Sequence, residues 1–161
     1  MTLPDRIHDL LNRLTGMPAR IASAVANISD ADKSVAPPNG EWSVSHILAH
    51  LRASDDILAH RLFAILTREN PTLPAYDERR WAEIAGYSEA DFELSLNTFT
   101  LRRAELVNML RQIDNESWQR LGTHEVKGAA SLFDVAASLV EHEEEHCAQL
   151  EALRDEKSHL P

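Results

Sequence analysis

Two histidines four residues apart are the most chemically suggestive feature of the sequence. They are His142 and His146, in the segment 141–150 that reads EHEEEHCAQL. Residues four apart in a helix project from the same face, so both imidazoles can bind a single ion. The letters also match the H-E-x-x-H signature of zinc proteases. The spacing therefore indicates a metal site, with a solvated acidic helix as the alternative.

The sequence that follows His146 argues against a zinc protease. That class needs a third ligand downstream, either a histidine that follows a glycine or a glutamate on another helix. The remaining chain, CAQLEALRDEKSHLP, contains no glycine and is too short for a turn and a returning helix. The third ligand must therefore come from upstream.

A di-iron carboxylate site is a minor alternative, because Glu143-x-x-His146 is the Glu-x-x-His element of such bundles. The site needs a second copy on another helix. The only upstream candidate is Asp5-x-x-His8, which lies at a helix end that is expected to fray. We therefore do not favour this class.

Glu143 and His146 also interrupt an apolar stripe. Alternating steps of four and three residues along the last helix pass through Leu132, Ala136, Leu139, Glu143, His146, Leu150 and Leu153. Burial of an unpaired carboxylate or imidazole costs several kcal/mol, so the fold must supply a partner. A metal ion is one candidate. For Glu143, a catalytic proton-transfer role and an ion pair with an arginine such as Arg103 both remain open.

The segment 43–68 offers three histidines as a third ligand. His50 lies at the flank of the apolar stripe of this segment, whereas His46 points nearly opposite the stripe. His60 shows no further pattern. His50 is therefore the best placed donor.

Helical periodicity predicts four long helices that position these residues. We expect them at about 3–28, 43–68, 88–113 and 131–157. Ser43 is a predicted N-cap, and the pairs Ser88-x-x-Asp91 and Ser131-x-x-Asp134 are predicted capping boxes. Gly16 and Pro18 are expected to kink the first helix.

The connections between these helices are long, at 29–42, 71–87 and 114–130, and residues 77–85 are expected to add a turn or two of helix. No segment shows sustained strand alternation. Four amphipathic helices of this length predict an all-α, up-and-down four-helix bundle that forms a single domain over 1–161.

Composition narrows the class of protein. The 161 residues are 43% hydrophobic and 26% charged, with a net charge of −10, so neither nucleic acid nor an anionic membrane surface is an expected partner. A single cysteine, Cys147, excludes an internal disulfide and is expected to be a buried thiol. No apolar stretch approaches the roughly 20 residues of a membrane span. We expect a cytoplasmic protein.

Three segments together resemble the DinB-like superfamily, which includes the YfiT-type candidate metal-dependent hydrolases. They are EWSVSHILAHL at 41–51, GTHEVKG at 122–128 and EHEEEHCAQL at 141–150. The resemblance extends from about residue 3 to about residue 154 and implies a bundle with His50, His142 and His146 as the metal ligands. The chain departs from the family pattern at Ala53, where many members carry aspartate.

The resemblance implies one divalent ion, with zinc or nickel favoured and iron or manganese as further options. It implies a metal-dependent hydrolase, or an S-transferase that uses a low-molecular-weight thiol, acting on a small electrophilic substrate. A non-catalytic metal-dependent binding or stress-response protein is the alternative. Glu143 is then the candidate catalytic residue. His124 is a candidate pocket residue, unless it caps its own loop. An exposed bundle face makes a homodimer the expected assembly.

Overall fold

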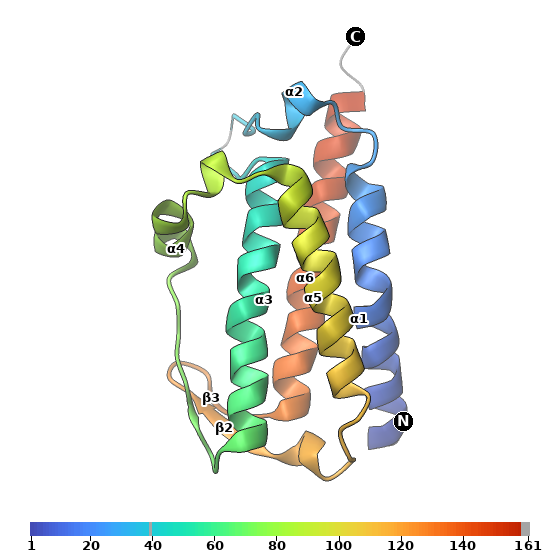
Figure 1. Ribbon diagram of the computed structural model, residues 1–161, viewed down its shortest axis with the longest axis vertical. Helices are drawn as coiled ribbons and strands as arrows, with labels where there is room; N and C mark the ends of the chain where they lie inside the picture. The colour runs from blue at the N-terminus through green and yellow to red at the C-terminus, as the bar shows by residue number, and fades with distance from the viewer. Residues whose placement is uncertain (39, 159–161) are drawn as a thin grey trace.

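Four long helices form a bundle (Figure 1). The computed structural model describes residues 1–38 and 40–158. The long helices are α1 (Leu3–Val25), α3 (Val44–Thr67), α5 (Phe92–Leu110) and α6 (Leu132–Ser158). The predicted all-α four-helix bundle is therefore confirmed. The single-domain prediction over 1–161 also includes Asn39 and residues 159–161, which lie outside the described residues, and it stays a prediction.

The order of helix directions is up, down, down, up (Figure 1). One core cluster joins the first halves of α1 and α6 to the second halves of α3 and α5. The other cluster joins the opposite halves. Helices α3 and α5 thus run parallel, although a simple up-and-down bundle would alternate. The connection 68–91 makes this possible by returning along the length of the bundle, a path that apolar stripes alone do not reveal.

Helix starts follow local side-chain chemistry. Ser43 caps α3 by accepting a hydrogen bond from the His46 backbone N–H at 3.3 Å. Ser131 and Asp134 exchange backbone and side-chain hydrogen bonds of 2.9 and 3.1 Å, which confirms that capping box. The predicted box that begins at Ser88 is wrong, because Asp91 itself caps α5 and accepts from the Leu94 N–H at 2.7 Å. Pro18 lies inside an uninterrupted α1.

The connections contain short elements. They are α2 (Asp30–Lys33), β1 (Thr72–Leu73), α4 (Glu78–Ala85), η1 (Tyr87–Glu89), η2 (Ser117–Gln119), β2 (Leu121–His124) and β3 (Gly128–Ser131). The expected helical turns at 77–85 are confirmed as α4. No helix of the described residues is long and apolar enough to cross a bilayer.

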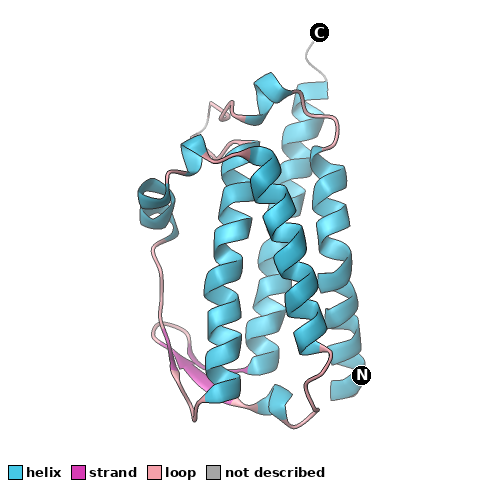
Figure 2. Cartoon of the chain, viewed as in Figure 1, coloured by secondary structure: helices cyan, strands magenta, loops and turns pink. Residues whose placement is uncertain are grey.

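A three-stranded sheet covers one end of the bundle (Figure 2). Its order is β1-β2-β3, with β1 parallel to β2 and β2 antiparallel to β3. The sequence did not indicate these strands, because strands of two to four residues are too short to show sustained alternation. A Cβ at Gly122 would lie 3.0 Å from Ile65 Cγ1 and 3.1 Å from Leu73 Cδ1, so glycine lets β2 approach the core closely without displacing these side chains.

A layer of polar side chains separates the two apolar clusters. The buried Asp55, Arg103 and Glu143 come from α3, α5 and α6 respectively, and His50 and His146 lie at the same level of the bundle. Ala53 packs in a small cluster with Ala49 and Tyr87. Any functional chemistry in the bundle interior is concentrated in this layer.

Candidate metal centre

Three imidazoles from α3 and α6 converge on one point. His142 Nε2 lies 2.8 Å from His50 Nε2 and 3.1 Å from His146 Nε2. One ring nitrogen from each histidine lies within 4.8 Å of the other two. A tetrahedral ion with metal–nitrogen bonds of about 2.0–2.1 Å places its ligand nitrogens roughly 3.3 Å apart. The spacing of this histidine triad (His50, His142, His146) therefore fits a single ion.

Packing fixes the three rings. His142 and His146 share one face of α6, and His50 faces them from α3; His50 is 2% exposed and His146 is 9% exposed. The Trp42 ring lies 4.7 Å from the His50 ring and stacks on the His146 ring at 6.4 Å. A single tryptophan at the start of α3 thus covers two members of the triad.

Gln149 determines which nitrogen of His146 carries the proton. His146 Nδ1 lies 2.8 Å from Gln149 Oε1, and a carbonyl oxygen only accepts, so Nδ1–H is the donor. In the neutral ring, Nε2 then presents its lone pair toward His142. Such a partner orients a ligand histidine and raises its affinity for metal.

Burial keeps His50 and His142 neutral. Desolvation, followed by the repulsion of His142 and His146, lowers the pKa of His50 to about 3. Desolvation also lowers the pKa of His142 to about 4, with a smaller contribution from His146 and then Arg103. Neutral imidazole is the form that binds metal, so at neutral pH these two donors need not lose a proton first.

Glu143 takes part in a buried charge cluster (Asp55, Arg103, Glu143). Arg103 donates to Asp55 Oδ1 at 2.5 Å and makes a close ion pair with Glu143. Desolvation raises the pKa of Glu143 to about 8, which outweighs the attraction of Arg103. The structure therefore gives Glu143 the arginine partner that the sequence left open, and its catalytic role stays a prediction.

His124 caps the hairpin turn between β2 and β3. Its Nδ1 accepts hydrogen bonds from the backbone N–H groups of Val126 and Lys127 at 3.2 and 3.3 Å. The capping alternative thus describes its contacts, whereas its role in a substrate pocket stays a prediction. The neighbouring Lys127 lines the cavity described next.

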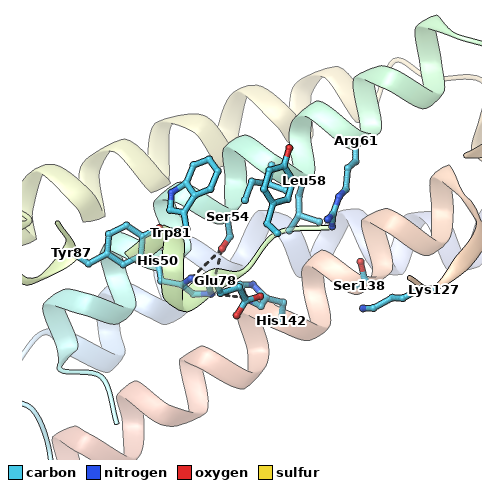
Figure 3. Close-up of a pocket in the computed structure, with 12 residues that line it drawn as sticks. His50, Ser54, Leu58, Arg61, Glu78, Trp81, Tyr87, Lys127, Ser138 and His142 are labelled. Carbon is cyan, nitrogen blue, oxygen red and sulfur yellow. Dashed lines mark hydrogen bonds between the residues drawn. The ribbon is translucent and has the colours of Figure 1, made fainter. Parts of the chain in front are cut away.

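Two cavities reach the triad. The α4 cavity, of about 140 Å³, is bounded by His50 and His142 together with residues of α3, α4 and the hairpin (Figure 3). The Trp42 cavity, of about 330 Å³, is bounded by Trp42, His146 and Gln149. Glu78 of α4 lines both cavities. The triad is therefore accessible from two sides.

Several of these residues were missed from the sequence. Gln149 contacts His146, and Ser54 contacts His50. They follow these histidines by three and four residues, so helical spacing from a ligand would have indicated both. Glu78 and Lys127 come from connections that reach the cavity only in the folded chain. No local pattern signals them.

Comparison with known proteins agrees with this architecture. The DinB superfamily profile matches residues 13–150. An Oceanobacillus iheyensis protein named as a candidate metal-dependent hydrolase is 27% identical over 93% of this chain and 86% of its own length. The Bacillus subtilis protein YfiT, named in the same way, is 26% identical over 87% of this chain and 79% of its own.

Solved structures show the same fold. YfiT from Bacillus subtilis, described as having an unusual four-helix bundle topology, superposes with a TM-score of 0.87 at 24% identity, over 94% of this chain and 87% of that one. A mycothiol-dependent maleylpyruvate isomerase superposes with a TM-score of 0.74 at 17% identity, over 93% of this chain and 63% of that one. From the profile match, which spans most of the chain, we conclude that this protein belongs to the DinB superfamily.

Proposed function

We propose that this protein is a metal-dependent enzyme in which His50, His142 and His146 hold one divalent ion. The main observation is that three imidazoles converge beside a cavity, those of His50 and His146 buried and that of His142 half-buried. Three protein ligands leave a coordination position open, which is typical of catalytic rather than structural sites. An open cavity at that position favours turnover over the alternative of a non-catalytic binding or stress-response protein.

The ion, when bound, would supply a Lewis acid and lower the pKa of a coordinated water or thiol. The chain supplies the rest. Burial keeps His50 and His142 unprotonated, and Gln149 directs the Nε2 lone pair of His146 inward. Imidazole ligands suit zinc and nickel, with iron and manganese as further options.

Hydrolysis of a small electrophilic substrate is the first candidate reaction, in line with the names of the relatives. Transfer to a low-molecular-weight thiol is the second. It is favoured by the two cavities that meet at the triad, since they provide separate room for a thiol and an electrophile. In that reaction the thiol sulfur forms a bond to the electrophilic carbon, the leaving group departs with the bonding electrons, and the thiol proton passes to it or to water.

Metal content tests the site. Protein purified without an affinity tag should contain about one divalent ion per chain, measured by elemental analysis. Alanine at His50, His142 or His146 should each weaken metal binding by more than about tenfold, because each substitution removes a ligand. The exposed His60 on α3 provides the control, and His60→Ala should retain the ion.

Equal metal content in all four variants would contradict the proposal. Turnover is tested by incubating the metal-loaded protein with small esters, amides and alkylating electrophiles, with and without thiols. An enzyme should lose activity on chelation and recover it when metal is restored. A protein that binds metal but turns over none of these compounds would support the non-catalytic alternative.

A further inference from the structure

Positive charge lies at the end of the α4 cavity that is farthest from the triad. His50, Ser54, Leu58 and Arg61 line the cavity from one face of α3, and Lys127 reaches it from the hairpin (Figure 3). The Cα atoms of His50 and Arg61 are roughly 16 Å apart along the helix. Helical side chains lean toward the N-terminus, which turns Arg61 back toward His50. The cavity therefore has a triad end and a cationic end.

Arg61 is a cation without a matching anion. One of its terminal nitrogens donates to the carbonyl oxygen of Pro74 at 2.5 Å, and its buried Nε has no acceptor. Arg61 forms no ion pair within 4 Å in the described part of the chain. Its guanidinium carbon lies 5.7 Å from the centre of the Tyr76 ring, and Glu125 and Glu78 act on it from farther away. Burial lowers the pKa of Arg61, in keeping with the absence of an acceptor for its Nε. Such a group favours an anionic ligand.

We propose that the α4 cavity binds the carboxylate of a small monoanionic substrate at Arg61 and Lys127, with the reactive carbon held at the triad. The assignment rests on the proposed function, because it names the substrate class of the same site. Two cations and one carboxylate, that of Glu78, line the cavity, so their net charge of +1 matches a monoanion. The volume of about 140 Å³ suits a ligand of a few carbon atoms.

A monocarboxylate fits better than a phosphate-type dianion. Glu78 lines the same cavity and would repel the second negative charge. Arginine also presents paired N–H donors in a geometry that matches a planar carboxylate, whereas lysine acts as a point charge. Arg61 is therefore expected to contribute more than the exposed Lys127.

Calorimetric titration with butyrate, its neutral isostere butyramide, and propylphosphonate tests the assignment. We expect butyrate to bind in preference to the other two, both in metal-loaded protein and after chelation. Arg61→Gln should weaken butyrate binding at least tenfold, and Lys127→Gln by a smaller factor. Arg68→Gln, on an exposed side chain at the end of α3, is the matched control and should bind butyrate like the unmodified protein.

The unmodified protein provides a second measurement if Arg61→Gln does not fold. The NMR resonance of the Arg61 Nε–H should shift on addition of butyrate but not of butyramide. Absence of that shift, equal affinity for butyrate and butyramide, or butyrate binding that is unaffected by Arg61→Gln would each overturn the assignment.

The two proposals fail in different ways. Butyrate binding that requires the metal and ignores Arg61 would place the carboxylate on the ion, which removes the Arg61 assignment and leaves the metal centre intact. Arg61-dependent binding by a protein that holds no metal would remove the metal centre and leave the anion site.

Discussion

The orientation of one ligand ring depends on a residue that does not itself belong to the triad. Gln149 accepts from His146 Nδ1 at 2.8 Å, one turn farther along α6. This contact holds the ring and selects its tautomer. At the proposed metal centre, affinity should therefore depend on side chains behind the ligands as well as on the ligands.

Gln149→Ala should weaken metal binding by about tenfold, the lower end of the range for such supporting residues. The substitution frees the His146 ring and removes the acceptor that fixes its tautomer. Competition against a chelator of known affinity measures the change. Gln149→Glu retains an acceptor and should restore binding, and Gln112→Ala, an exposed glutamine on another element, should leave it unchanged. Equal affinity in Gln149→Ala would show that packing alone orients the ring.

Sequence reasoning identified side chains whose positions follow from helical spacing. The pair His142 and His146 and the flanking position of His50 all have this origin, and the structure brings their nitrogens together. For Glu143, the sequence left open both an ion pair with an arginine such as Arg103 and a catalytic role in proton transfer. Glu78 and Lys127 were missed because their position in the cavity wall depends on how long connections fold, which no local period encodes.

Among the elements, the hairpin at the end of the bundle is held against the core by a close contact. Gly122 of β2 packs on Ile65 of α3 and Leu73 of β1, both of which are buried. The four long helices were predictable because their apolar stripes persist over many turns. The short strands were not, because their pairing is decided by contacts such as this one.

Two glycine substitutions should change stability in opposite directions. Gly122→Ala forces a methyl group against Ile65 and Leu73 and should lower the free energy of unfolding by about 1–3 kcal/mol. Gly16→Ala places a methyl group in open space within α1 and should raise it by about 0.5–1 kcal/mol. Urea denaturation followed by circular dichroism measures both. A neutral Gly122→Ala would mean that the sheet moves away from the core at little cost.

At the scale of the whole molecule, a polar layer divides the apolar core into two clusters. The layer contains the triad and the charge cluster of Asp55, Arg103 and Glu143. Its groups have shifted pKa values, so the stability of the entire bundle should depend on pH. The predicted homodimer and cytoplasmic location concern surfaces and surroundings beyond this interior and stay predictions.

Metal-free protein should lose stability as the pH falls from about 6.5 toward 4. His50 and His142 have lowered pKa values, about 3 and about 4, so below 6.5 the unfolded chain binds more protons than the folded one. Each extra proton corresponds to a slope of about 1.4 kcal/mol per pH unit. Urea denaturation between pH 4 and pH 8 measures the dependence.

Glu143 acts with the opposite sign. Its pKa is raised to about 8 from an ordinary value of 4.5, so between these values the folded chain binds more protons than the unfolded one. The contribution of Glu143 to the free energy of unfolding therefore falls as the pH rises through this range. Maximum stability is therefore expected near pH 6.5. The double variant His50→Gln, His142→Gln should no longer lose stability as the pH falls below 6.5, but it should still lose stability as the pH rises above 6.5. An unchanged loss of stability below pH 6.5 in this variant would show that these histidines are already protonated in the folded protein.

The connection that returns along the bundle has a consequence for diversification within the superfamily. It carries α4, which has no buried residue, yet Glu78 of this helix lines both cavities. Substitutions in α4 can therefore alter which compounds are admitted without disturbing the packing that makes the chain fold. This part of the cavity wall is therefore separate from the core, so the wall can diversify within the superfamily while the scaffold is inherited unchanged.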